Sequence, residues 1–413
     1  HARILSIDVT RAKSAPGVRA VITAGDFPDI KYVHFGAKYS DRYPLARGRV
    51  RFIGEEVAGV AADTLEQAKD AVRLIQVEYE PWPAAMTPEE AMREGAPEIH
   101  EPALTPGGRN VAQTRDLDFG DVEGAFAKAA RVFEKTYSHG VVVPACMETN
   151  GTVASWDPHE GKLTLWTATQ APHFIRKEVG HVLDLPVEQI HVRGVEVGGG
   201  FGGKSKVCEQ EAVAALLSIR CHRPVKLTLD RQEEFLSGKT DHAKTMTVRT
   251  AVDAQGNILA RSMSVVIDNG AYTALAPVYM AACRARTTSL YRVGAAHFDS
   301  RIVYTNKVPG GQYRGMGAPQ AIWAIDSQVD EIAEELGIDP LQYRIQIANR
   351  SGDVTPLGWE IGSCGLVQCL EEVRRRIEVQ DPRFVRANHG ALIERREPTV
   401  RPVAHAVDRV SAR

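Results

Sequence analysis

The sequence predicts an α+β protein, because short strand patterns alternate with amphipathic helical patterns and a hairpin signal lies between two of the strands. Residues 19–23 and 52–61 have strand patterns, and residues 318–336 have the apolar spacing of a long helix. The turn AQGN at 254–257 separates two further strand patterns, which indicates antiparallel pairing in that region. Mixed strand and helix order with hairpin-linked strands is typical of an α+β fold.

Composition divides the chain into four parts. Residues 1–83 alternate short strands and helices, and the chain starts at His1 inside a strand-like pattern, so we expect this domain to be N-terminally incomplete. Residues 84–117 are rich in proline and glycine and are predicted to be a linker, mostly loop with one short helix. Residues 118–376 form the larger domain. Residues 377–413 contain seven arginines and three prolines and are predicted to be an irregular tail.

Charge and cysteine usage limit the classes of partner. The chain has 50 Lys and Arg against 52 Asp and Glu, so it offers no bulk positive field for nucleic acid or an anionic membrane. No run of eighteen apolar residues occurs, so no membrane span is expected. Its six cysteines are scattered and form no CxxC pair. We therefore expect a cytoplasmic protein without an iron–sulfur or zinc site of its own.

The sharpest local motif is GGGFGGKS, from Gly198 to Ser205, which satisfies the P-loop pattern GxxxxGK[ST]. A strand is predicted before it and a helix over 206–219 after it, the context that this pattern requires. In a P-loop nucleotide triphosphatase the backbone N–H groups and Lys204 would hold phosphates. Asp268, at the end of a later strand, could hold magnesium.

Two features disfavour that interpretation. A P-loop normally opens a parallel sheet, whereas the strands after residue 225 are predicted to be antiparallel. Phe201 also has no obvious task in binding phosphate. A flexible backbone that approaches a large cofactor, with one side chain placed against it, fits the glycines better. A simple tight turn is the remaining alternative, although five glycines cost much backbone entropy.

A second glycine-bearing loop, GGQYRGMGAPQ at 310–320, precedes the predicted long helix. Arg314 lies between small residues near the helix N-terminus, where a guanidinium and free N–H groups would form an anion site. A surface arginine in a turn is the alternative.

Taken together, these segments resemble the molybdenum-binding large subunit of the xanthine dehydrogenase/aldehyde oxidase family of molybdenum hydroxylases. The motifs occur in the family's order, and Gln170 and Phe201 are 31 positions apart, as in the family. The resemblance implies an α/β hammerhead domain over 1–83 and the first molybdopterin-binding α/β domain over 118–376. The matching segments are HARILSID, RFIGEEVAGVAADTLEQAKDAVRLIQVEYE, VVVPACMETNGTVASWD, TLWTATQAPH, VGGGFGGK and QYRGMGAPQ.

The resemblance also implies roles for single residues around a molybdenum that the pterin dithiolene holds. Gln170 would lie beside the apical oxo ligand as a catalytic residue, the Phe201 backbone would contact the metal's oxygen, and Arg314 would anchor the cofactor. The pterin would contact Gly199, Gly200 and Gly202. Ser205 and Met316 would line the substrate pocket, and they differ from the Glu and the aromatic residue of purine-oxidising members. The second loop also lacks the cysteine of carbon monoxide dehydrogenases. An N-heteroaromatic compound or an aldehyde is therefore the expected substrate.

The implied reaction is oxidative hydroxylation with water as the oxygen source and a glutamate as the base. Electrons would pass to 2Fe-2S clusters and FAD on partner chains, and the molybdopterin cytosine dinucleotide is the expected cofactor form. The family's late Gly-Glu segment, which carries the base, has no equivalent here, so we expect a second molybdopterin-binding subunit, as in nicotinate dehydrogenase. Glu148, interpreted as a buried structural acid, and Glu209 and Glu211, interpreted as a solvated helix face, are weaker candidates for the base. An inactive cofactor-binding or assembly module remains a further alternative.

Overall fold

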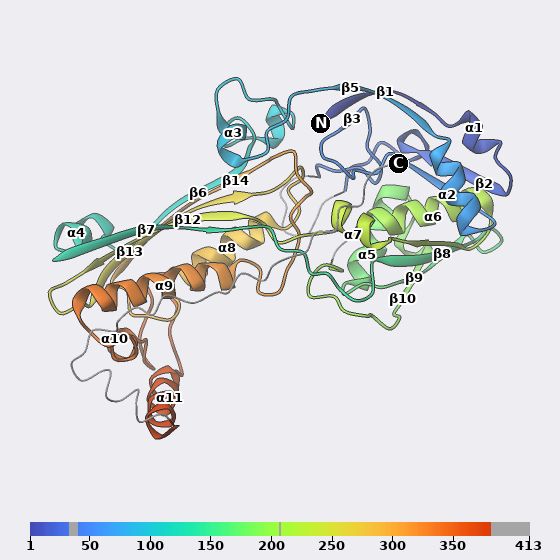
Figure 1. The fold of residues 1–413 in the computed structure, drawn as a ribbon. Coiled ribbons are helices and arrows are strands. Elements are labelled where there is room, and N and C mark those ends of the chain that lie inside the picture. Colours follow the sequence, from blue (N-terminus) through green and yellow to red (C-terminus); the bar gives the residue numbers. More distant parts are fainter. Residues whose placement is uncertain (33–39, 206–207, 381–413) are drawn as a thin grey trace, which may run out of the picture.

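The computed structural model describes residues 1–32, 40–205 and 208–380. Two lobes share the chain: the N-terminal segments pack with one sheet and its helices, and a second, longer sheet extends away from them (Figure 1). Within the described residues, no helix has both the length and the apolar character needed to cross a bilayer. Of the tail predicted for 377–413, residues 377–380 continue a helix and the rest lies outside the described residues.

The N-terminal domain contains two small antiparallel sheets. In one sheet the strand order is β3-β1-β5, and in the other β2 pairs with β4. Thr64 caps α2, because its hydroxyl accepts from the Gln67 N–H and the Gln67 side chain accepts from the Thr64 N–H. The elements are β1 (Ala2–Asp8), α1 (Thr10–Lys13), β2 (Val18–Thr23), β3 (Arg49–Val50), β4 (Ala58–Ala62), α2 (Leu65–Arg73) and β5 (Gln76–Pro81).

A four-stranded sheet of order β10-β9-β8-β11 packs against the N-terminal domain. Helix α6 lies under this sheet and under β2 and β4, and almost every residue of its first three turns is buried. One apolar core therefore serves both the N-terminal domain and this sheet. The elements are β8 (Gly151–Asp157), β9 (Lys162–Thr167), α5 (Pro172–Leu183), β10 (Ile190–Arg193), α6 (Glu209–Cys221), β11 (Val225–Thr228) and α7 (Arg231–Ser237).

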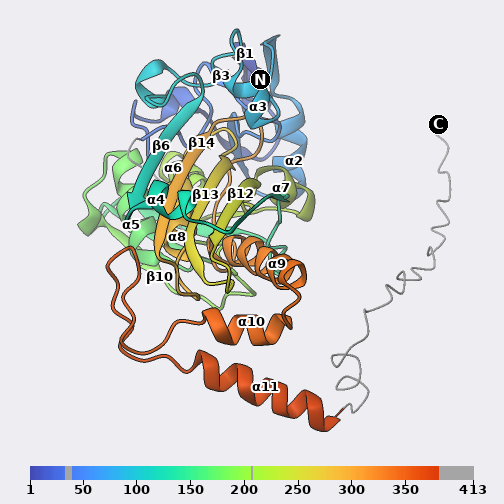
Figure 2. The same cartoon turned by 90° about the vertical axis from the view of Figure 1, so that its left-hand side faces the viewer.

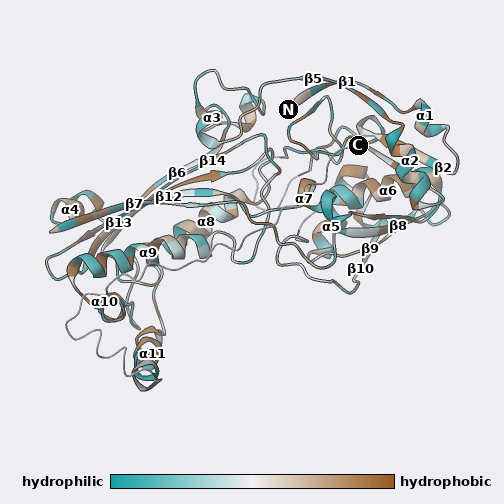
Figure 3. Ribbon diagram, in the orientation of Figure 1, coloured by the Kyte–Doolittle hydropathy of each residue, from teal (hydrophilic) through white to brown (hydrophobic). Residues whose placement is uncertain are grey.

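The longer sheet has five strands in the order β6-β14-β13-β12-β7, of which only β13 and β14 run parallel. Helices α8 and α9 lie against it, and α10 and α11 follow beyond them (Figure 2). In Figure 3, α9 carries both brown and teal bands, as expected for a helix that buries one side. The elements are α3 (Pro88–Met92), β6 (Val111–Phe119), α4 (Val122–Ala127), β7 (Arg131–His139), β12 (Lys244–Val252), β13 (Ile258–Asp268), α8 (Ala276–Arg286), β14 (Ala295–Val303), α9 (Ala318–Leu336), α10 (Pro340–Ile347) and α11 (Leu366–Gln380).

The α+β fold class is confirmed, and so are the long helix over 318–336 and the hairpin between β12 and β13. Two expectations were wrong in detail. The segment 84–117 is not mostly loop to its end, because β6 begins at Val111 and pairs with β14 at the edge of the long sheet. The strand predicted to run into the first glycine loop ends at Arg193, and the described part of the next helix begins at Glu209.

Phe298 lies fully buried at the centre of β14, in the core between the long sheet and its helices. We expect Phe298→Ala to lower the free energy of unfolding by about 3–5 kcal/mol, because it removes a buried ring and leaves a cavity. Val132→Ala, at a half-exposed position of β7, is the control and should change it by less than about 1 kcal/mol. Urea unfolding followed by circular dichroism measures both values, and equal values for the two variants would contradict this core assignment.

Candidate functional site

The two glycine loops touch each other, although more than a hundred residues separate them in the sequence. Gly202 of the first loop has φ +98°, and a Cβ atom there would lie 2.6 Å from Cγ and 2.7 Å from the carbonyl oxygen of Gln312 in the second loop. Such distances are shorter than any contact that a side chain tolerates. Glycine at 202 is therefore required both by the backbone conformation and by the approach of the second loop.

Gln170 is fixed to the first loop by its backbone and by its side chain. It follows β9 and precedes α5, and its N–H donates to the Lys204 carbonyl at 2.9 Å. Its Oε1 accepts from the Gly202 N–H at 3.0 Å. A Cβ at Gly200 would lie 2.6 Å from the Gln170 Cδ. The amide carbon and oxygen are thus held against the loop, and the Nε2 group makes no hydrogen bond to another described residue.

Phe201 adopts φ +48°, a left-handed conformation that is unfavourable for an aromatic residue. Its side chain is 50% exposed, and a Cβ at Gly199 would lie 3.3 Å from its ring. The ring therefore folds back over its own loop. Strained backbone of this kind is maintained by its surroundings and gathers at functional sites.

Lys204, the lysine of the P-loop pattern, points into the protein. Its side chain is 1% exposed, and its Nζ forms an ion pair with Glu148 Oε2 at 2.5 Å. Glu148 Oε2 also accepts from the Gly198 N–H at 2.8 Å, and hydrogen bonding to Lys204 lowers the pKa of Glu148. The Glu148 side chain is 42% exposed, so its interpretation as a buried acid was wrong. A lysine committed to this pair is not available to a phosphate, which removes the basis of the P-loop interpretation.

The second loop presents Arg314 to solvent. Gly315, Met316 and Gly317 all have positive φ, which turns the chain sharply before α9. The Tyr313 N–H donates to the Tyr279 hydroxyl at 2.9 Å, which ties the loop to α8. Arg314 is exposed and makes no hydrogen bond or ion pair with another described residue. An exposed, unpaired guanidinium on a fixed loop is suited to an anionic ligand.

The two residues expected at a substrate pocket lie on different loops. Ser205 is partly buried, and its N–H donates to the Gly202 carbonyl at 3.0 Å. Met316 has φ +47° and packs partly buried against the core of the long sheet. In the described part of the chain no hydrogen bond links the two side chains. Their shared role in a pocket stays a prediction.

A buried ion network stands behind both loops, and the sequence analysis missed it. Glu209 Oε1 pairs with Lys239 Nζ at 2.8 Å and with the buried guanidinium of Arg42 from the N-terminal domain. The stem of Lys239 packs on Gly311 of the second loop, where a Cβ would lie 2.5 Å from the Lys239 Cβ. Glu209 begins the helix that follows the first loop. The ion pair therefore connects the helix that follows the first loop to Gly311 of the second loop.

Glu209 and Glu211 were expected on a solvated helix face, and this was wrong: they are only 3% and 4% exposed. Glu211 Oε1 accepts from the Thr167 hydroxyl at 2.7 Å. Burial raises the pKa of Glu211 to about 7, with nearby Glu209 acting in the same direction. No local signal could have revealed this, because the cations that pair with Glu209 come from distant segments.

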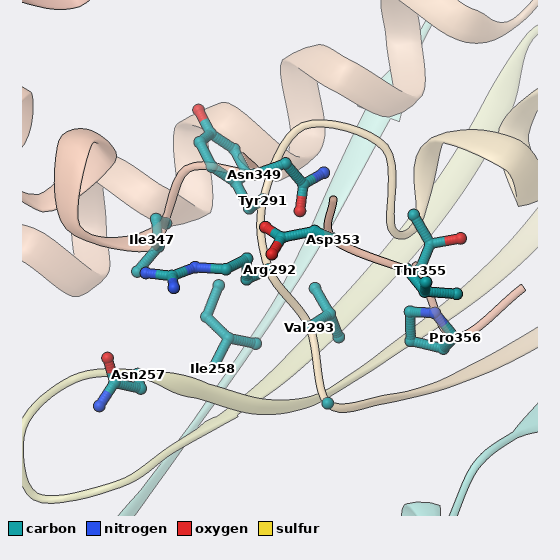
Figure 4. A pocket seen from close by; sticks show the side chains of 12 residues that line it. Asn257, Ile258, Tyr291, Arg292, Val293, Ile347, Asn349, Asp353, Thr355 and Pro356 are labelled. Carbon is teal, nitrogen blue, oxygen red and sulfur yellow. The ribbon is translucent and has the colours of Figure 1, made fainter. Parts of the chain in front are cut away.

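A separate cavity of about 370 Å³ lies at the far end of the long sheet (Figure 4). Its polar groups are engaged within the protein: Tyr291 donates to Asp326 at 2.6 Å, and Asn349 donates to the Ser289 carbonyl at 3.0 Å. None of the site residues predicted from the sequence lines it. The two loops remain the candidate site.

Comparison with protein families gives two matches. The molybdopterin cofactor-binding domain matches residues 104–347, which include both glycine loops and Gln170. The α/β hammerhead domain of aldehyde oxidase and xanthine dehydrogenase matches residues 1–83.

Several curated proteins are similar over most of this chain. The xanthine dehydrogenase molybdenum-binding subunit of Escherichia coli is 35% identical over 96% of this chain and 53% of its own length. The nicotinate dehydrogenase large molybdopterin subunit of Eubacterium barkeri is 33% identical over 91% of this chain and 86% of its own length. The chain thus spans about half the length of several relatives and most of the length of one.

Solved structures agree in fold. Quinoline 2-oxidoreductase from Pseudomonas putida matches with a TM-score of 0.84 and 32% identity, over 94% of this chain and 50% of that chain. Aldehyde oxidoreductase from Desulfovibrio gigas matches with a TM-score of 0.85 and 28% identity, over 92% of this chain and 42% of that chain.

Removing the charge of Glu209 should destabilise the protein strongly. Glu209→Gln keeps the shape of the side chain but leaves Lys239 and Arg42 with less compensation in a buried site. We expect a loss of about 3–5 kcal/mol in the free energy of unfolding. Glu66→Gln, at an exposed position of α2, is the matched control and should have little effect. Chemical denaturation measures the free energy of unfolding of both variants. A loss for Glu209→Gln that is no larger than the loss for Glu66→Gln would refute the role of the network.

Glu211 should make stability depend on pH. Its folded pKa of about 7 lies above the ordinary value of 4.5, so the unfolded chain ionises first and stability falls as pH rises from about 4.5 to 7. Glu211→Gln removes this loss of stability. The free energy of unfolding of the variant should therefore equal that of wild type at pH 4 and exceed it at pH 8 by up to about 3 kcal/mol. Thermal unfolding across this pH range measures the difference. A constant difference at all pH values would contradict the assignment.

Proposed function

Because the chain belongs to the xanthine dehydrogenase/aldehyde oxidase family of molybdopterin cofactor-binding proteins, we propose that it is the cofactor-binding part of a multi-subunit molybdenum hydroxylase. The proposed reaction is the oxidative hydroxylation of an N-heteroaromatic compound or an aldehyde, with water as the oxygen source. Relatives named for quinoline, nicotinate and aldehyde oxidation support this range of substrates.

The contact between the two glycine loops carries this proposal. The backbone of Gly202 approaches Gln312 more closely than any side chain would allow, so residues 198–205 and 310–317 form one surface. Arg314 is exposed on this surface without a partner among the described residues, as a group that anchors an anionic cofactor should be. Lys204 is turned away into its ion pair with Glu148. A large cofactor held by backbone and one guanidinium fits this arrangement.

When bound, the molybdenum cofactor supplies oxygen transfer and two-electron chemistry, and its metal is held by the pterin dithiolene. The chain's own residues would bind and orient it. The Gln170 Oε1 accepts from the Gly202 N–H, whereas its Nε2 group has no acceptor among the described residues and can donate to the cofactor. The Phe201 backbone and Arg314 would complete the contacts around the metal and the pterin. Gly199, Gly200 and Gly202 would let the backbone approach the cofactor.

We propose that the glutamate base comes from another polypeptide. The three acids of this chain that were considered for the role are engaged: Glu148 pairs with Lys204, Glu209 pairs with Lys239, and Glu211 accepts from Thr167. A second molybdopterin-binding subunit would supply the base. An iron–sulfur subunit and an FAD subunit would accept the electrons, and the molybdopterin cytosine dinucleotide is the proposed cofactor form.

All six cysteines lie among the described residues as free thiols, a state that a reducing compartment such as the cytoplasm maintains. The cytoplasmic location belongs to the same proposal as the partner subunits.

Gly202→Ala tests the proposed cofactor site. The new Cβ would force Gln312 away and the residue would keep a strained positive φ, so we expect molybdenum and pterin in the purified complex to fall at least about tenfold. Gly194→Ala is the matched control, because its Cβ would meet nothing within 4 Å. Metal analysis and the fluorescence of oxidised pterin measure the cofactor content directly.

Loss of cofactor in the Gly202 variant, with the control fully loaded and both folded by circular dichroism, is the expected result. A wild-type complex that contains no molybdenum or pterin would refute the proposal. So would magnesium-dependent ATP or GTP binding that is lost in Lys204→Ala, because Lys204 should not contact a nucleotide.

A further inference from the structure

Two sheets of the protein end in unpaired edges that face the same cavity. Among residues 1–32, 40–205 and 208–380, strand β4 is bonded only to β2, and β11 is bonded only to β8. A cavity of about 760 Å³ is lined by Val60–Ala62 of β4 on one side and by residues 223–226 and Thr228 on the other. Elements β2, α2, α6 and β8 gather at this end of the molecule, at the right of Figure 1. A sheet edge carries unpaired N–H and C=O groups that can bind another strand.

The two edges rest on one helix and present matching faces to it. A Cβ at Gly59 of β4 would lie 3.0 Å from the Val213 side chain of α6, and Val225 and Leu227 of β11 belong to the same apolar core. The intervening residues face the opposite side, among them Lys226. Because side chains alternate along a strand, both edges have their apolar face on α6. We interpret them as two parts of one sheet with a strand missing between them.

The backbone of β11 offers donors to this gap. The Leu229 N–H donates to the Asn150 carbonyl at 2.9 Å, and the register pairs Thr228 with Gly151 and Lys226 with Val153. In an antiparallel ladder every second residue bonds to the partner strand, so the N–H groups of Lys226 and Thr228 point away from β8. Within the described residues neither N–H has a hydrogen-bond acceptor.

We propose that an extended strand from polypeptide beyond these 413 residues inserts between β4 and β11 and joins the two sheets. The source is the part that longer relatives carry outside the region matched here: the quinoline 2-oxidoreductase structure matches 94% of this chain with only 50% of its own. Main-chain hydrogen bonds to both edges would provide affinity. A segment of about five residues would suffice, the usual length of a strand.

Charge at the rim defines the chemistry of the inserted strand. Arg19 and Arg223 both pair with Asp63, whereas Lys226 has no carboxylate partner among the described residues. The strand should carry apolar side chains toward α6 and an acidic or polar side chain toward Lys226, because opposite charges on neighbouring strands stabilise pairing. This inference rests on the sheet edges alone and is independent of the proposed cofactor chemistry.

Hydrogen–deuterium exchange of the full chain, alone and within the assembly purified from its native host, tests the proposal. We expect amides of residues 225–229 and 58–62 to exchange at least about tenfold more slowly in the assembly. Lys226→Pro removes an N–H that faces the gap, and this change breaks no hydrogen bond within the described residues. The variant should therefore fold alone but should not gain the slower exchange in the assembly. Lys226→Ala keeps the N–H, so this variant should still show the slower exchange in the assembly.

A photo-crosslinker attached to Thr228→Cys identifies the occupant by mass spectrometry. A cross-link to polypeptide that aligns with the part that longer relatives carry outside the matched region supports the proposal, whereas a cross-link to an iron–sulfur or FAD subunit would overturn it. Cross-links to residues 381–413 or to a second copy of this chain would overturn it, and so would equal exchange of both edges in the free chain and in the assembly. Molybdenum and pterin contents, measured on the same samples, show separately whether the proposed function fails.

Discussion

The ion pair between Glu209 and Lys239 holds together the parts from which the candidate site is built. Glu209 begins the helix after the first glycine loop, and Lys239 packs along Gly311 of the second. Arg42 adds a second cation from the N-terminal domain. A buried acid that compensates two buried cations is costly to disturb, because its removal takes away the carboxylate that pairs with Lys239 and leaves Arg42 paired with Glu56 alone among the described residues. The network therefore fixes the separation of two glycine-rich segments that have little stiffness of their own.

Structural contacts also engage the three glutamates that were considered for the role of the base. Glu148 is held ionised by Lys204, and Glu209 is neutralised by its cations. Glu211 of α6 is buried against Thr167 with a raised pKa, and it lies within the core rather than on the surface of the loops. Each acid has a structural partner that explains its position. The surface formed by the loops is thus suited to binding and orientation, and in the proposed function the glutamate base would come from another polypeptide.

Elements with a strong local signal could be predicted from the sequence. Helix α9 was found with its bounds because its apolar spacing is regular and Gly337 ends it in a left-handed conformation. Strand β6 was missed, since it is an edge strand with a largely polar sequence that follows a proline and two glycines. The burial of Glu209 was missed because α6 is covered on all sides, and a helix without a polar face offers no periodicity to read. The order of weak motifs indicated the candidate site, whose role stays a prediction, but the contact of Gly202 with Gln312 could be found only from the structure.

The long sheet is assembled from strands made at very different times. Its edges β6 and β7 come from residues 111–139, whereas the central strands β12, β13 and β14 come from residues 244–303. During synthesis the ribosome delivers both edges first, and they must wait for more than a hundred residues before any strand can pair with them. High contact order of this kind slows folding and leaves early strands open to wrong association. Production of this protein should therefore depend on chaperones and on slow translation more than its final stability would suggest.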